Sequence, residues 1–251
     1  MMSPGFVQAE TSSDYHNELL QNYRTYQSLL DPFYTQRSRH QTHGTVSTQA
    51  ELLAATRSLI ETEVKAIASY TNFINSYLSE ASAVLGLSQE SLTIKLKDEI
   101  DFLVNAEAKA KNLSSLAEGK ALLKEINQHY NTITGFSYQV QSIIKFESSK
   151  RVYSNLKIEK EKLNNYLSQN TSENYQALAA REKFQALDLK MNLIEKTLEE
   201  IEKKVYPDAN MDNKEIDWKK TYSGINNKTK EIVSSFNKII LGYQNIVFSL
   251  K

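Results

Sequence analysis

Histidines come first among the residues that could do chemistry, because the chain of 251 residues contains no cysteine. His40 and His43 are three residues apart, a spacing that places two ring nitrogens on one helix face, where a transition metal can bind. A stable site needs a third ligand, often a carboxylate, and none lies nearby in the sequence. Arg37 and Arg39 flank the pair and oppose a cation. We therefore interpret these histidines as a solvated helix end.

Motifs for catalysis or cofactor binding are missing from the sequence. It contains no Gly-rich phosphate loop, no Gly-x-Ser-x-Gly elbow and no His-Glu-x-x-His motif. The paired Glu-x-x-His motifs of a di-metal helical bundle are missing as well. His16 and His129 stand alone, and His129 lies among apolar residues, which is typical of a histidine at the edge of a core. We predict a protein that is not an enzyme, with no catalytic residue, cofactor or metal site.

A basic run in the segment 145–162 is the strongest charge pattern. An anionic surface is one conceivable partner for it, but Glu147, Glu159 and Glu161 are interleaved with Lys145, Lys150, Arg151, Lys157, Lys160 and Lys162. We interpret the run as the mixed-charge outer face of a long helix. The whole chain has 30 Lys and Arg against 30 Asp and Glu, and this balance argues against general binding of nucleic acid.

Aromatic and apolar residues leave two questions open. The 14 tyrosines either edge a narrow core with their hydroxyls in water or form an interaction surface. The stretch 239–250 is the most apolar of the chain but too short to span a bilayer. It forms either a core helix or a segment that docks on a membrane interface or in a partner's groove.

The elements that carry these residues are predicted to be helices, because 7 Gly and 3 Pro are few for a β fold. Apolar residues recur at steps of three and four. They predict an all-α, elongated antiparallel helical bundle or coiled coil of about six helices, built on one long central helix over 115–169. The first helix is expected to begin at Asp14 and to carry the apolar stripe Leu19, Tyr23, Tyr26, Leu30 and Phe33. The other helices are expected over 48–85, 89–112, the segment before Pro207, and 216–250.

Helix ends are predicted from capping residues. Asp14, Thr48, Ser88 and Ser115 are expected to cap the first four helices at their N-termini, and Gly86 is expected to end the second. Pro32 is expected to bend or end the first helix near Asp31. The polar segment 37–46 is then a helix end and a loop.

The N-terminal segment 1–13 is predicted to be a disordered N-terminus or the remnant of a signal peptide, and 14–251 a single helical bundle domain. Val7-Gln8-Ala9 matches the small-residue pattern at a signal-peptidase cut, although a charged region and a full apolar region are missing before it.

Residues 15–85 carry a resemblance to a family. The matching residues are Tyr23-Arg-Thr-Tyr26-Gln, Thr45-Val-Ser-Thr-Gln-Ala50 and the run Leu-Leu-Ala-Ala-Thr-Arg-Ser-Leu-Ile after it. They resemble uncharacterised secreted helical coiled-coil proteins of candidate-phyla bacteria. The resemblance implies a secreted or envelope-associated helical protein, and it transfers no functional residue.

The expected function is that of a non-enzymatic, exported helical scaffold or interaction protein at the cell envelope. Its partner is another protein or a second copy of the chain, not nucleic acid. Membrane contact is expected only through the C-terminal helix, without a transmembrane span. The alternatives are a secreted membrane-active or toxin-like protein and an extracytoplasmic ligand-sensing bundle, and a cytoplasmic location is the alternative to export.

Overall fold

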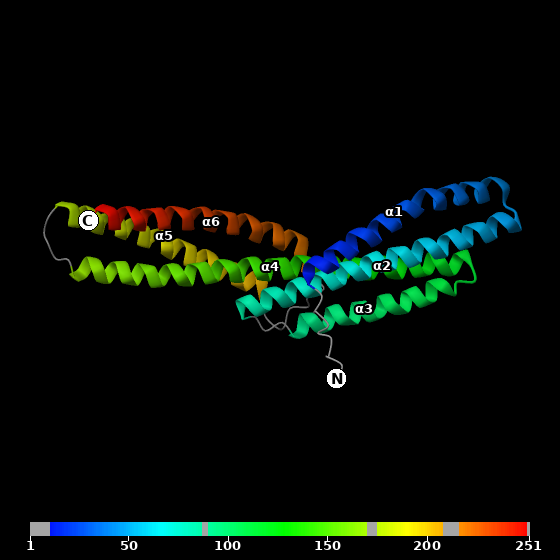
Figure 1. Cartoon of the computed structure of the whole chain (residues 1–251), viewed down its shortest axis with the longest axis horizontal. Coiled ribbons are helices and arrows are strands. Elements are labelled where there is room, and N and C mark those ends of the chain that lie inside the picture. Colours follow the sequence, from blue (N-terminus) through cyan, green and yellow to red (C-terminus); the bar gives the residue numbers. More distant parts are fainter. Residues whose placement is uncertain (1–10, 87–89, 170–174, 208–215, 250–251) are drawn as a thin grey trace, which may run out of the picture. The chain divides into compact units, whose positions relative to one another are not determined.

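The structure is a computed structural model that describes residues 11–86, 90–169, 175–207 and 216–249. Within these ranges the chain forms helices and no strand, and the predicted all-α helical bundle is confirmed. The six helices (Figure 1) are α1 (Ser12–His43), α2 (Val46–Leu85), α3 (Glu90–Lys111), α4 (Leu116–Gln169), α5 (Tyr175–Val205) and α6 (Trp218–Ser249).

The chain divides into two compact units. Unit 1 comprises residues 1–137 and unit 2 comprises residues 138–251. The boundary falls inside α4, so the first part of that helix packs in unit 1 and the rest in unit 2. Residues 1–10 of the predicted N-terminal segment lie outside the described residues, as does Ser88, which was expected to cap α3.

Two predicted N-caps are wrong by three residues. The cap of α1 is Thr11, whose hydroxyl accepts the amide of Asp14, and Asp14 accepts the amide of Thr11 in return. Thr45 and Thr48 form the same reciprocal pair at the start of α2. In both cases the residue predicted as the cap is the third helical residue of a capping box. The C-terminal glycine is confirmed, since Gly86 has φ +72.

Of the two effects expected of Pro32, a bend or a helix end, the structure excludes the helix end: α1 continues to His43 before Gly44 turns the chain at φ +60. Proline removes one helical hydrogen bond, but contacts with α2 hold the segment beyond it. Arg39 pairs with Glu51 at 3.1 Å between Nη1 and Oε2. Half-buried Nδ1 of His40 lies 3.1 Å from the Thr48 hydroxyl. The one hydrogen bond lost at Pro32 is thus not enough to end α1, and contacts with α2 continue beyond it.

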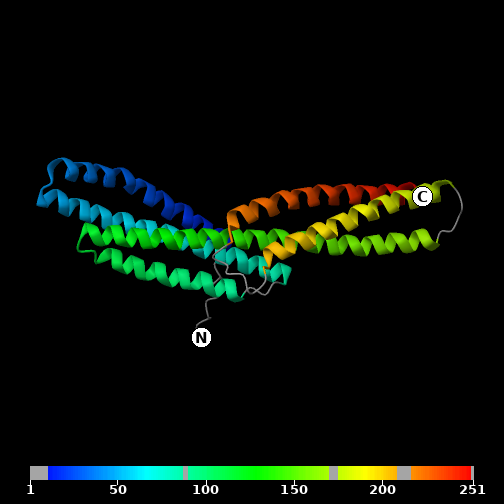
Figure 2. The same ribbon diagram turned by 180° about the vertical axis from the view of Figure 1, so that it is seen from behind.

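Unit 1 is organised around α2, which contacts every other helix of the unit. Asn22 of α1 donates to Ser69, Lys65 pairs with Glu107 of α3, and Tyr70 donates to Ser137 of α4 at 2.8 Å. Both views show α1 and α2 side by side (Figures 1 and 2). The sequence of α2 predicts two seven-residue rows on its buried face. Their middle members are buried, namely Ile60, Val64, Ile67, Thr71, Ile74 and Leu78. Their outer members Leu53, Ala81 and Leu85 are only half-buried.

Unit 2 consists of the rest of α4 with α5 and α6, and α5 and α6 run beside each other in both views (Figures 1 and 2). The three-four repeat predicted on α5 is its buried face: Leu187, Met191, Ile194, Leu198, Ile201 and Val205. At Gly242 the backbone of α6 comes so close to α5 that an added Cβ would lie 2.7 Å from Cδ1 of Leu187. The two helices therefore pack tightly at this point.

Candidate functional site

The histidines do not assemble a metal site in the structure. Across the described ranges, no three metal-ligating side chains gather. His40 contacts Thr48 and lies in the last turn of α1 with His43. His129 is partly buried, with Nδ1 2.6 Å from Oε2 of Glu99, and its ring stacks on Phe102 with ring centroids 3.4 Å apart. These contacts join α3 to the first part of α4.

The basic run lies partly between helices rather than only on an outer face. Lys150, Lys157 and Lys160 of α4 form ion pairs with Glu202, Glu195 and Asp188 of α5. Lys145 lies over the ring of Tyr222 on α6, 5.9 Å from its centroid. Basic and acidic side chains are thus mixed along this part of α4, as expected. Much of the basic run, however, contacts side chains of α5 and α6. It does not form an open anion-binding surface.

Helix α6 has two apolar faces, of which one is buried and the other exposed in the part of unit 2 that the structure describes. The buried face contains Ile225, Ile232, Phe236, Ile239, Tyr243 and Ile246. The second face, which we call the α6 stripe, is exposed to solvent and consists of Val233, Ile240, Leu241, Val247 and Phe248. Phe248 is 71% exposed. The C-terminal apolar stretch is thus a core helix on one side and an open surface on the other.

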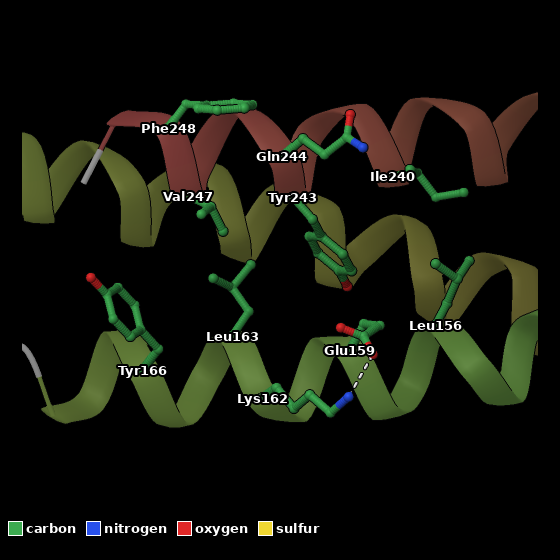
Figure 3. Close-up of a pocket in the computed structure, with 10 residues that line it drawn as sticks. All are labelled: Leu156, Glu159, Lys162, Leu163, Tyr166, Ile240, Tyr243, Gln244, Val247 and Phe248. Carbon is green, nitrogen blue, oxygen red and sulfur yellow. Dashed lines mark hydrogen bonds and ion pairs between the residues drawn. The ribbon is translucent and has the colours of Figure 1, made fainter. Parts of the chain in front are cut away.

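A groove of about 580 Å³ lies beside the α6 stripe, between α6 and the second part of α4 (Figure 3). Leu156, Leu163 and Tyr166 reach into it from α4, and Tyr243 and Val247 reach toward them from α6. Its charged lining residues, Glu159 and Lys162, form an ion pair at 2.7 Å between Oε1 and Nζ. The groove is therefore mostly apolar and electrically balanced.

The Tyr243 hydroxyl is a buried polar group without a hydrogen-bond partner among the described residues. Its ring stacks on Phe184 of α5, with centroids 6.3 Å apart. Burial, assisted by the negative charge of Asp188, raises the pKa of Tyr243 to about 12. The hydroxyl stays protonated at neutral pH and offers one unused donor at the groove.

The sequence contains a signal for the α6 stripe that periodicity analysis of the core missed. Val233, Ile240 and Val247 are spaced by seven residues, as are Leu241 and Phe248. Both rows run parallel to the buried row, so the apolar part of α6 is wider than its buried face. Only the structure shows which rows α4 and α5 cover.

None of the helices that the structure describes contains an apolar stretch long enough to cross a bilayer. No family model, curated protein or solved structure matches the chain. The resemblance to secreted proteins of candidate-phyla bacteria therefore stays a prediction. What the structure offers for function is an exposed apolar stripe with an adjoining groove in unit 2.

Proposed function

We propose that the protein is a non-enzymatic, exported helical scaffold at the cell envelope that works by self-association through the α6 stripe. The observation that carries the proposal is the exposure of five large apolar side chains in two seven-residue rows on one helix. Exposed apolar side chains that gather on one helix face are typical of protein interaction sites.

A second copy of the chain is the partner that the stripe fits best, because the longer of its two rows is symmetric about Ile240. Val233 lies seven residues before Ile240 and Val247 lies seven residues after it. When two such helices pack antiparallel around a twofold axis at Ile240, Val233 of each copy meets Val247 of the other. Each residue of this row then contacts its own symmetry mate or exchanges partners, as a twofold interface requires. Leu241 and Phe248 do not share this symmetry, because the positions related to them about Ile240 are the buried Ile239 and Ile232.

Charge supports the same partner. Lys238 is the only charged residue between positions 232 and 249, so the stripe offers little to steer an oppositely charged protein toward it. Two copies approach without general repulsion, since the net charge of the chain is zero. Apolar burial would supply the free energy of association.

The groove beside the stripe would be covered in the same complex. Ile240 and Val247 line the groove and also belong to the stripe, so a helix laid on the stripe reaches the groove's edge.

Export to the cell envelope rests on the Val7-Gln8-Ala9 pattern and on the resemblance of residues 15–85. Residues 7–9 lie outside the described residues. Sequencing the N-terminus of protein purified from its native cells tests this part. A start after Ala9 supports cleavage and export, whereas an intact Met1 would remove the argument.

Sedimentation equilibrium of the full chain tests the self-association. We expect a concentration-dependent dimer for the natural chain and a monomer for Ile240→Glu, which places a charge at the centre of the stripe. Ile94→Glu is the matched control, because Ile94 is 53% exposed on α3 in unit 1. Circular dichroism of all three checks that the helices remain folded.

Two other results would point to different occupants of the stripe. A monomeric chain that binds anionic vesicles and loses this binding in Ile240→Glu would favour the membrane-active alternative. A monomer that binds neither itself nor vesicles would leave the α6 stripe without the proposed role.

A further inference from the structure

A second pocket, in unit 1, contains an unusual combination of side chains. Its volume is about 420 Å³, and residues of α1, α2 and α4 line it. Tyr23 and Tyr26 come from α1, Tyr70 and Glu63 from α2, and Tyr130 from α4. Four tyrosines and one carboxylate, from three different helices, thus line one pocket that is open to solvent on the side of the exposed Tyr23 and Tyr130.

Glu63 is the charged group of this pocket. Burial raises the pKa of its carboxyl above the ordinary value. Within the described residues, no hydrogen bond or ion pair to Glu63 is formed, although Lys65 two residues later pairs with Glu107. A half-buried carboxylate without a partner is costly, and a cation in the pocket would remove that cost.

The tyrosines offer ring faces more than hydroxyl groups. Tyr70 already donates its hydroxyl to Ser137, so its contribution to the pocket is its ring. The rings of Tyr23 and Tyr26 have centroids 6.4 Å apart and planes tilted by 36°. Tyr26 lies near enough to Glu63 for the carboxylate charge to raise the pKa of its phenol, after the larger effect of burial.

We propose that this pocket binds an organic ammonium ion, with the charge held by Glu63 and the substituents packed against the rings of Tyr23, Tyr26, Tyr70 and Tyr130. Aromatic ring faces attract cations. Proteins that bind quaternary ammonium ligands commonly do so in cages of aromatic side chains. A small metal ion would find only one carboxylate here, too few oxygen ligands for a stable site. An anion would be repelled by Glu63.

The proposal is independent of the α6 stripe, because all its residues belong to unit 1. It gives the ligand-sensing alternative a specific ligand class. Both properties can coexist in one chain, and each has its own test.

The full chain is titrated with each probe, and changes in its NMR chemical shifts measure binding. Choline is the quaternary ammonium probe and butylammonium is the primary ammonium probe. The neutral isostere of choline, 3,3-dimethylbutan-1-ol, is the control for apolar binding. We expect saturable binding of at least one cation, and affinity for the neutral isostere lower by about tenfold or more. Preference for choline would identify a methylated ammonium, and equal binding would identify ammonium ions in general.

Glu63→Gln is the decisive variant, since it keeps the shape of the side chain and removes the charge. We expect the affinity of this variant for the cation to fall by about tenfold or more. We also expect its melting temperature to rise, so that misfolding would not explain the loss of binding. Glu61→Gln, on the same helix but outside the pocket, is the matched control. Tyr26→Leu should weaken binding and Tyr77→Leu, also outside the pocket, should not.

Three outcomes would overturn the proposal. They are no saturable shift with either cation, equal affinity for choline and its neutral isostere, and choline binding by Glu63→Gln that equals the natural chain.

Discussion

Nζ of Lys157 on α4 lies 3.1 Å from Oε1 of Glu195 on α5. Seven residues earlier on α4, Lys150 pairs with Glu202, which lies seven residues later on α5. The two pairs therefore define the antiparallel register of these helices. Because their side chains are between 42% and 50% exposed, the pairs specify alignment more than they add stability.

Charge reversal tests this register. We expect Lys157→Glu to lower the free energy of unfolding by about 0.5–1 kcal/mol, because two carboxylates then face each other. The double variant Lys157→Glu with Glu195→Lys should recover most of that loss. Urea unfolding followed by circular dichroism measures both. Equal stability of the single and double variants would show that the two residues do not interact.

Two glycines of α6 should respond to alanine in opposite directions. At Gly242 a new Cβ would lie 2.7 Å from Cδ1 of buried Leu187, and overpacking of this kind costs about 1–3 kcal/mol. At Gly224 an added Cβ has no neighbour within 4 Å. There the better helix propensity of alanine should stabilise the protein by about 1 kcal/mol. Thermal unfolding of Gly242→Ala and Gly224→Ala compares them, and a rise in both melting temperatures would show that α5 and α6 are not in close contact.

Tyr243→Phe should stabilise unit 2 or leave it unchanged. The variant removes a buried hydroxyl that has no hydrogen-bond partner among the described residues, and such a group costs about 1–3 kcal/mol. The chains with and without Tyr243→Phe are best compared when both also carry Ile240→Glu, because that variant is expected to be a monomer. Chemical unfolding measures the difference, and a clear loss of stability would reveal a hydrogen bond within the chain.

Glu63→Gln should stabilise the unliganded protein at neutral pH, with a specific pH dependence. Burial raises the folded-state pKa of Glu63 above its ordinary value, so the folded state binds the proton more tightly than the unfolded state. The carboxyl therefore costs no stability below about pH 4.5, and the cost appears as the pH rises through the higher folded-state pKa.

Melting temperatures of Glu63→Gln and the natural chain should accordingly agree at pH 4 and diverge by pH 7. Glu61→Gln provides the comparison for loss of a surface charge. A gain that is largest at low pH would contradict the assigned burial.

The helices themselves could be predicted from the sequence because burial imposes the three-four period that defines them. Ile194, Leu198 and Ile201, all predicted on the apolar face of α5, are buried. Gly86 was also predicted correctly, since few residues besides glycine accept its positive φ. Thr11 and Thr45 were missed because both partners of a capping box are good cap residues, and the spacing alone does not say which comes first.

The candidate sites could not be predicted from the sequence, for a different reason. Nothing local distinguishes Val233 from Val205 as exposed or buried, because the answer depends on which helices pack on each face. Glu63 is likewise one acidic residue among 30 Asp and Glu. Its position next to Tyr26 and Tyr130 arises only when α1, α2 and α4 come together.

Single cysteines on the α6 stripe test the central claim most directly, because the natural chain has none. In an antiparallel pair centred on Ile240, Val233 of one copy faces Val247 of the other, while the two copies of Val233 lie about 20 Å apart along the helix axis. A mixture of Val233→Cys and Val247→Cys chains should therefore form a cross-linked heterodimer under mild oxidation, and neither chain should cross-link alone. Cross-linking of Val233→Cys with itself, or no cross-link in the mixture, would contradict the proposed self-association.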